Sequence, residues 1–404
     1  MLKRTNTTRA NWVRAGLAAC LGFGLAAQAE VPHDFTSGTP VRASEMNANF
    51  QDLDQRLTGL EQGPVDGGQE LIIVDCGPDA GALQAAADEA HPGDTVEFSG
   101  TCDPIDVRVD ELTIRGTTGA MVTTAAPAGA VVIVDAARQV VLENFTVDGN
   151  EGMAEEGVLV DVGAIVGLAD LVVVDAGDGN VLVRNGSLVK PAGGNSVGEM
   201  DDDTGLIVGG NATVLIAGAN TINAGFAGID CEFAGVVMQD GVGADEMLTV
   251  NGVTGAIENC MIFISNGTLN GDIYMQQNSS MTLEPEHTGS SIVATGNIQM
   301  SQYSSLLVDN EGPVTLGGGT MTLIGGTFIM HGGTLNSDLH LHASSRAELG
   351  DGVMAQSGTD TIQLHSFSTL HSLGTLTTNE VVCFGANSAF NDDGVGGFTD
   401  LCQE

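Results

Sequence analysis

Three consecutive carboxylates are the first residues in this chain that have the means to do chemistry. Asp201, Asp202 and Asp203 stand in a polar stretch between two glycines. Calcium prefers carboxylate and carbonyl oxygens as ligands, so this run is a candidate calcium site. It lacks the spacing of an EF-hand and the glycine-aspartate nonapeptide of calcium-loaded β-rolls. A solvated acidic loop is the alternative, and calcium is the cofactor that the carboxylates suggest.

Histidines form the second candidate group, since five of the eight fall in the last quarter of the chain. His340 and His342 lie on the same face of one expected strand. The repeat pattern described below places His342 beside His365 on the next strand, about 4.8 Å away. Two stacked imidazoles bind a transition metal or respond to mild acid. The alternative is an exposed ladder of polar side chains with no metal.

Residues for catalysis on acidic sugars are scarce. A glycoside hydrolase needs two carboxylates that flank the scissile bond, and a polysaccharide lyase needs a base together with cations that neutralise a uronate. After residue 29 the chain keeps one lysine, and four of its arginines lie between residues 108 and 184 in the first half: Lys190, and Arg108, Arg115, Arg138 and Arg184. These arginines either share a face that binds an anionic sugar or pair with nearby acids. The sequence therefore predicts no catalytic residue.

The first 29 residues read as a signal peptide. Four basic residues precede a small apolar run, and Ala27-Gln28-Ala29 matches the Ala-x-Ala cleavage pattern. The alternative, a lipoprotein site at Leu17 to Cys20, leaves almost no apolar region before it. We expect export to the periplasm, the cell surface or the medium. No later stretch offers about 20 apolar residues, so no membrane span is predicted.

Charge and cysteines narrow the partners and the compartment. The chain has 12 Lys and Arg against 52 Asp and Glu, a field that repels nucleic acid. Six cysteines follow the signal peptide, an even number that predicts disulfides in an exported protein. They group as neighbours, and neighbour pairing suits a solenoid, in which only nearby coils touch: Cys76 and Cys102, Cys231 and Cys260, Cys383 and Cys402.

Residues 30–68 differ in texture from the rest of the chain. The stretch 39–62 is predicted to be a helix with an apolar heptad seam, formed by Met46, Phe50, Leu53, Leu57 and Leu60. The seam either joins chains into an oligomer or packs on the body behind it. Residues 63–68 read as a hinge, and residues 69–404 form the main domain.

Internal repetition predicts the fold of that domain. Four similar segments begin at Asp272, Asn297, Asp338 and Thr361, which are 25, 41 and 23 residues apart, so the middle gap holds two coils. The pattern predicts an all-β, right-handed parallel β-helix with coils of about 20–25 residues. Alternate apolar residues would fill its core, with Gln, His and Ser facing water. A helix near 81–89 and the segment from Cys383 to Cys402 would cover its ends.

Several motifs resemble a known family. The chain has Cys76-Gly77, Leu83-Gln84-Ala85-Ala86, the run His91-Pro92-Gly93-Asp94-Thr95-Val96, Gly100-Thr101-Cys102 and Leu112-Thr113-Ile114-Arg115-Gly116. These resemble the entry coil of secreted bacterial pectin-lyase-like β-helix proteins. Residues 38–50 resemble a front segment of phage tail-fibre-like and bacterial surface proteins. The resemblance implies the fold and export; for activity it is weak.

The hydrolase branch of that family implies paired Asp residues, a His-Gly and an Arg-x-Lys. This chain has Asp201 to Asp203 and His331-Gly332 but no Arg-x-Lys. We therefore expect a non-enzymatic secreted or cell-surface protein, structural or adhesive, whose partner is a polysaccharide or cell-surface glycan. One alternative is a carbohydrate-active enzyme of the same fold. The other is a tail-spike-like receptor-binding homotrimer.

Overall fold

The computed structural model describes residues 69–199, 204–239, 246–285, 289–309, 312–355, 361–373, 375–376, 380–384 and 388–392. The expected signal peptide (1–29) and the expected helix and hinge (30–68) lie outside these residues. So do Asp201, Asp202, Asp203 and Cys402. The predictions made for them stay predictions.

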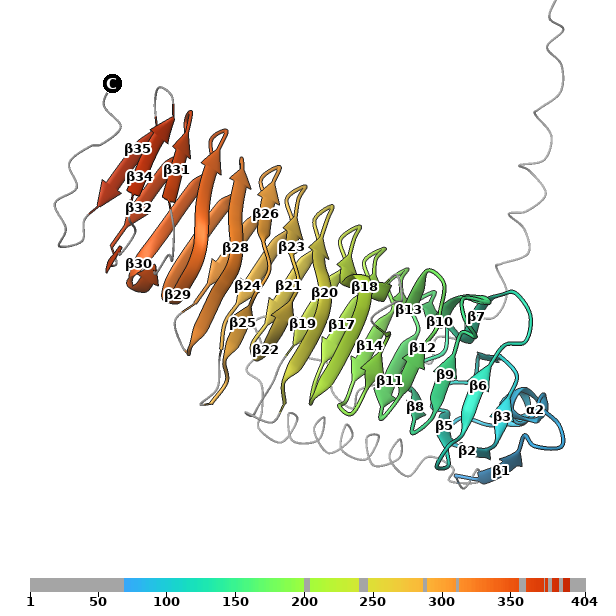
Figure 1. The fold of residues 1–404 in the computed structure, drawn as a ribbon. Coiled ribbons are helices and arrows are strands. Elements are labelled where there is room, and N and C mark those ends of the chain that lie inside the picture. Colours follow the sequence, from blue (N-terminus) through green and yellow to red (C-terminus); the bar gives the residue numbers. More distant parts are fainter. Residues whose placement is uncertain are drawn as a thin grey trace, which may run out of the picture. The chain divides into compact units, whose positions relative to one another are not determined.

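The described residues form a right-handed parallel β-helix of about 12 turns, as the repeats predicted (Figure 1). Every strand pairing is parallel, and each strand is hydrogen-bonded to a strand one turn away along the chain. Each turn contributes to three stacks of strands, which we call faces 1, 2 and 3. Long strands bend at a corner and take part in two faces.

Face 1 carries the groove described below. Its strands, in order, are β4 (Ile105–Val107), β7 (Ala128–Asp135), β10 (Ala154–Asp161), β13 (Gly179–Val183), β16 (Thr204–Val208), β18 (Asn220–Cys231), β20 (Leu248–Ala256), β23 (Ile273–Met275), β26 (Ile298–Ser301), β28 (Val314–Ile324), β29 (Thr327–His342), β31 (Thr361–His365) and β34 (Glu380–Phe384). The C-terminal parts of β18, β20, β28 and β29 are the parts that belong to this face.

Face 2 begins with the first strand of the described residues. Its members are β1 (Leu71–Asp75), β2 (Thr95–Ser99), β5 (Thr113–Gly116), β8 (Val140–Glu143), β11 (Ile165–Ala169), β14 (Leu188–Pro191), β17 (Thr213–Ile216), β19 (Val236–Gln239), β21 (Met261–Ile264), β24 (Ser280–Leu283), β27 (Ser305–Val308), the start of β29, β30 (Arg346–Ala355), β32 (Thr369–Ser372) and β35 (Ala389–Asp392). Its outward positions point away from face 1, which makes it a source of control variants.

Face 3 has the shortest strands. They are β3 (Thr101–Cys102), β6 (Met121–Thr123), β9 (Thr146–Asp148), β12 (Val172–Val174), β15 (Ser196–Val197), the starts of β18, β20 and β28, β22 (Gly267–Asn270), β25 (Ile292–Ala294), the middle of β29, the end of β30 and β33 (Thr375–Leu376). An asparagine ladder runs along its edge, where Asn251 donates to Asn223 at 2.7 Å and Asn270 donates to Asn251 at 2.9 Å.

The coil length varies more than the sequence suggested. Register partners on face 1 are 27 residues apart between Val107 and Val134 and 18 apart between Leu323 and Leu341. The four repeated segments are register partners, and a coil through Met321 fills the gap between the second and the third. Insertions at the corners explain part of the spread, and the pairings β18–β20, β28–β29 and β29–β30 also shift register within these long strands.

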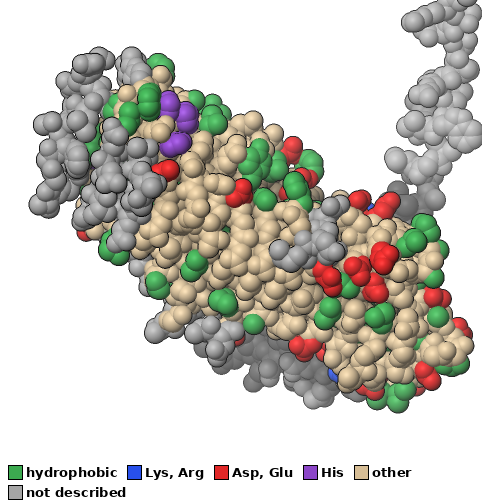
Figure 2. All heavy atoms as spheres, viewed as in Figure 1, with side chains coloured by type: hydrophobic (Ala, Val, Ile, Leu, Met, Phe, Trp, Pro, Cys, Tyr) green, Lys and Arg blue, Asp and Glu red, His purple; other side chains and the backbone are tan. Residues whose placement is uncertain are grey.

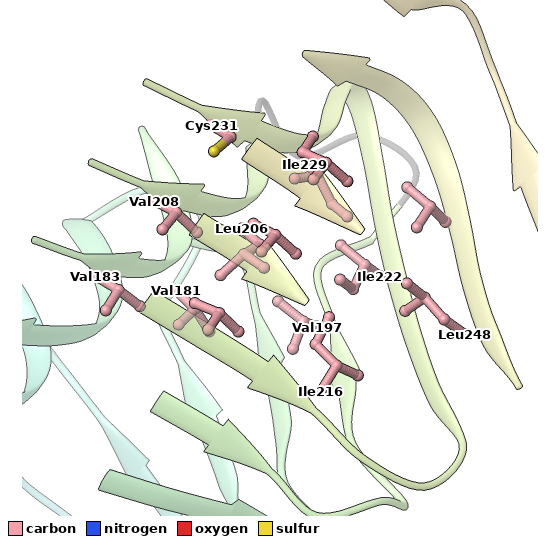
Figure 3. Packing of buried hydrophobic residues seen from close by; sticks show 14 of the residues in the cluster. Val181, Val183, Val197, Leu206, Val208, Ile216, Ile222, Ile229, Cys231 and Leu248 are labelled. Atoms are coloured by element: carbon pink, nitrogen blue, oxygen red, sulfur yellow. The ribbon is translucent and has the colours of Figure 1, made fainter. Parts of the chain in front are cut away.

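The core is a column of inward side chains stacked coil upon coil. On face 1, Val183, Val208 and Cys231 follow one another and are completely buried (Figure 3). Inward and outward residues alternate along each strand, as the period of two requires. Each coil therefore buries its apolar residues against only two neighbours, and stability accumulates along the axis.

One part of the expected pattern was wrong. The serines that follow each face 1 strand do not face water, because Ser279, Ser304 and Ser368 are fully buried at the corner. The two residues before each of them include residues with positive φ, such as Asn278 (61°) and Tyr303 (66°). This tight turn directs the next side chain inward, where only a small one fits. The serine hydroxyl then bonds to backbone there, as Ser304 does to the Met275 carbonyl at 3.3 Å.

Two of the expected disulfides are present. Cys76 is bonded to Cys102 and Cys231 to Cys260, each joining residues one turn apart. Cys383 is also disulfide-bonded. The expected helix is present as α2 (Ala82–Glu89), and its Leu83 and Ala87 join the buried core beside the first coils. It covers the open end of the apolar column, as predicted.

Removal of the central disulfide should destabilise the β-helix. We expect the pair Cys231→Ala and Cys260→Ala to lower the free energy of unfolding by about 3 kcal/mol, because the bond closes a loop in the unfolded chain. Chemical denaturation followed by circular dichroism measures this. The pair Cys76→Ala and Cys102→Ala is the matched control and should cost a similar amount, since its loop is similarly long. An unchanged midpoint in both would contradict the account.

Candidate ligand-binding groove

One row of outward side chains on face 1 changes character near its middle. Following the register, Asp230 of β18 lies beside Gly255 of β20, Gly255 beside Tyr274 of β23, and Tyr274 beside Gln299 of β26. Neighbouring strands are about 4.8 Å apart, so Asp230 and Tyr274 stand about 9.6 Å apart along the axis. Between them the sheet carries no side chain.

A groove of about 370 Å³ opens at this place. It is lined by Phe226, Ala227, Asp230, Val253, Gly255, Ile257, Asp272, Ile273, Tyr274, Asn297 and Gln299. Gly255 keeps it open: a Cβ at this position would lie 3.3 Å from a carboxylate oxygen of Asp230 and would stand in the hollow. A volume of this size, with apolar walls and a few polar groups, is typical of sites for small molecules.

The Asp230 carboxylate is the most unusual group in the groove. Burial raises its pKa above the ordinary value for Asp. Within the part of the chain that the structure describes, it makes no hydrogen bond and no ion pair. The side chain is partly buried, and a partly buried carboxylate without such a partner costs some stability, which makes Asp230 a candidate for ligand binding.

A second carboxylate adds to the negative charge. Glu232 follows Asp230 by two residues and lies directly after the end of β18. Its pKa is raised by burial, then by the charge of Asp230 and by that of Glu258. The charge of Asp230 therefore makes Glu232 harder to ionise, whereas burial alone raises the pKa of Asp230.

The far rim of the groove is polar and ordered. The backbone N–H and the Nδ2 of Asn297 both donate to the Asp272 carboxylate, at 2.8 and 3.1 Å. Gln276 Nε2 donates to the Tyr274 hydroxyl at 2.5 Å, which fixes the ring of Tyr274. Phe226 is 69% exposed at the opposite edge. The groove thus combines aromatic faces with carboxylate and amide groups.

The histidines meet as the repeats predicted. His342 stacks on His365 with ring centres 3.9 Å apart, and His365 stacks on Phe384 at 4.8 Å. They form a patch near the C-terminal end of the described β-helix (Figure 2). The pKa of His342 is lowered by burial and by the charges of His365 and His340.

The stack brings together two histidines and a phenylalanine. Parallel rings direct their nitrogen lone pairs side by side, so the pairs do not converge on one ion. Among the described residues, no group of three or more His, Cys, Asp or Glu side chains could hold a metal. The calcium candidates Asp201, Asp202 and Asp203 lie outside those residues.

The arginines do not assemble into an anion site. Arg108 pairs with Asp106 at 2.6 Å and Arg184 with Asp161 at 2.9 Å, while Arg115 pairs with Glu143 on face 2. Arg138 follows β7, and its backbone N–H donates to Asp110. The sequence left two alternatives open for these arginines, a shared anion-binding face or pairing with nearby acids. Pairing with acids holds for three of the four arginines.

The sequence patterns did not predict the groove. Tyr274 belongs to a repeated segment but was not a candidate site residue, and neither were Asp230 and Gly255. The feature that the sequence does contain is a missing side chain in one outward row. Tyr274 and Gln299 occupy the same outward position of their coils, and one coil earlier that position holds glycine. Aligning every coil, instead of four, would have shown the missing side chain.

No family model, curated protein or solved structure matches this chain. Within the described residues, no helix is long and apolar enough to cross a membrane. What the protein does has therefore to be argued from the groove itself.

The partial burial of Asp230 predicts that its ionised carboxylate lowers the stability of the fold. Its raised pKa means that ionisation opposes folding at neutral pH, so Asp230→Asn should raise the free energy of unfolding by on the order of 1 kcal/mol. The gain should shrink as the pH falls from the raised pKa toward the ordinary value for Asp, because the carboxyl is then protonated in the unfolded chain as well as in the folded one. Thermal unfolding at pH 7 and at pH 4 measures both.

Asp161 is the matched control for this prediction. Burial raises the pKa of Asp161, but hydrogen bonds from Asn185 and Arg184 leave that pKa below the ordinary value for Asp. Asp161→Asn should therefore lower stability at pH 7 by about 1 kcal/mol, a loss that shrinks in acid. Destabilisation by both variants at pH 7 would show that the Asp230 carboxylate supports the fold.

Proposed function

We propose that this protein is a secreted or cell-surface β-helix that binds a glycan in the face 1 groove without cleaving it. The observation that carries the proposal is the hollow over Gly255, which lies between Asp230 and the fixed ring of Tyr274. A sugar ring has apolar faces and a rim of hydroxyl groups. Aromatic rings suit the former, and carboxylate and amide oxygens suit the latter.

The scaffold supports a binding role. Parallel strands on three sides and a continuous apolar core hold the groove on rigid elements, so little ordering is needed when a ligand binds. The disulfide between Cys231 and Cys260 ties together the two coils that carry Asp230 and Gly255. Disulfides persist in an oxidising compartment, which fits export.

The resemblance to pectin-lyase-like proteins also supports glycan binding. That resemblance, at the entry coil from Cys76 to Gly116, favours a polysaccharide as the partner. It does not supply the groove, because the groove lies several coils later. A trimer built through residues 38–62 remains a prediction that depends on residues outside the described part.

Glycoside hydrolysis is the second candidate, and one observation favours it. Asp230, with its pKa raised by burial, and the exposed Asp272 line the same groove. Two carboxylates in different environments are what an acid and its partner require. Release of new reducing ends from a bound oligosaccharide would show that the protein hydrolyses the glycan as well as binding it.

Filling the hollow should remove binding. We expect Gly255→Val to weaken retention on a glycan array by more than about tenfold, because the new side chain stands where the sugar ring lies. Tyr274→Ala should weaken it as well, through loss of the aromatic face. Circular dichroism checks that both variants fold.

Gly167→Ala is the matched control. Gly167 lies outward on β11 of face 2, and a Cβ there meets its neighbours at ordinary distances of 3.7 and 3.9 Å. This variant should bind as the wild type does. Equal binding by wild type and Gly255→Val would show that the groove is not the site.

A further inference from the structure

The charge around the groove restricts what kind of glycan fits. Asp230 and Asp272 line it, and Glu232 lies two residues after Asp230, just past the end of β18. No lysine or arginine occurs in the sequence between Lys190 and Arg346. The coils of β18, β20, β23 and β26, which carry the groove, therefore offer no lysine or arginine to compensate these carboxylates.

The nearest basic residues along the chain lie away from the groove or are paired. Lys190 is on β14 of face 2, Arg184 is paired with Asp161, and Arg346 is paired with Glu348 at 2.7 Å. An anionic sugar such as a uronate would approach a field of its own sign with no cation to receive it. A neutral sugar would leave the half-buried Asp230 carboxylate with hydroxyl donors only.

A positively charged ligand matches the groove better. We propose, on the basis of the glycan-binding function above, that the groove takes an amino sugar in its ammonium form, such as a glucosamine unit of an oligosaccharide. The ammonium group pairs with the Asp230 carboxylate, and the ring lies over Gly255 against Tyr274.

The chemistry on both sides is complementary. An ammonium group carries three donors and no acceptor, while an ionised carboxylate is an acceptor only. Hydrogen bonds between charged groups are stronger than neutral ones, and more so where water is partly excluded. The ring of Tyr274 presents a negative face to a nearby cation.

A metal ion is a poorer occupant of the same space. Within the described part of the chain, no set of three metal-binding side chains converges. The groove is also too large for one ion, at about 370 Å³. A ring bearing one positive charge uses both the volume and the carboxylate.

Three oligosaccharides test the inference on the full chain by isothermal titration calorimetry at pH 6. They are a β-1,4-linked glucosamine tetramer, its N-acetylated counterpart and a galacturonate tetramer. We expect the glucosamine tetramer to bind about tenfold or more tighter than the acetylated one, and the galacturonate tetramer not to bind. Asp230→Asn should abolish the preference for the amine.

Glu97→Gln is the matched control for charge. Glu97 lies on β2 of face 2, so this variant removes one negative charge at a distance from the groove. It should keep the preference. If it weakens binding as much as Asp230→Asn does, the general field and not Asp230 selects the ligand, and the inference fails.

The remaining outcomes separate the two proposals. Equal binding of the amine and the acetylated tetramers overturns the amino-sugar inference and leaves the glycan-binding function standing. Tightest binding of the galacturonate tetramer does the same. Binding of none of the three, by a chain that circular dichroism shows to be folded, overturns both.

Discussion

Backbone hydrogen bonding between successive coils is the constraint on which the rest of this protein depends. Each strand of the described residues pairs in parallel with the strand one turn away, about 4.8 Å distant. That pairing sorts every residue into an inward column or an outward row. A single outward residue is therefore read together with its neighbours on the coils before and after it, however far apart they are in sequence.

The groove is a local departure from that order. Along the outward row, a glycine takes the place of a side chain at position 255, and the carboxylate and the aromatic ring on either side become the walls of a hollow. The opposite edge of the hollow comes from Phe226, which lies where the pairing of β18 with β20 shifts register between Asn223 and Ala227. The cost is the half-buried Asp230 carboxylate without a partner among the described residues, and the structure tolerates it because the apolar column beneath is continuous.

Much of the fold followed from the sequence, and for a physical reason. A solenoid repeats one set of contacts, so four segments between Asp272 and Ser368 were enough to predict parallel coils, the additional coil through Met321 and the stacking of His342 on His365. Neighbour pairing of cysteines followed from the same locality. The buried serines were missed, because their direction depends on positive φ values at the preceding turn, which residue type alone does not reveal.

The site was harder to predict than the fold. Asp230, Gly255 and Tyr274 are ordinary residues in an acidic, glycine-rich chain. They line one groove only because the register brings them together, and burial, which sequence does not show, raises the pKa of Asp230. Of the more conspicuous residues, Asp201 to Asp203 lie outside the described residues and stay a prediction, while three of the four arginines between residues 108 and 184 are paired with acids.

The most direct test of the account is a crystal structure of the protein with the glucosamine tetramer bound. The account predicts a sugar ring over Gly255, packed against Tyr274, with its amino nitrogen within hydrogen-bonding distance of the Asp230 carboxylate. A tetramer bound on another face, with the hollow over Gly255 empty, would contradict it.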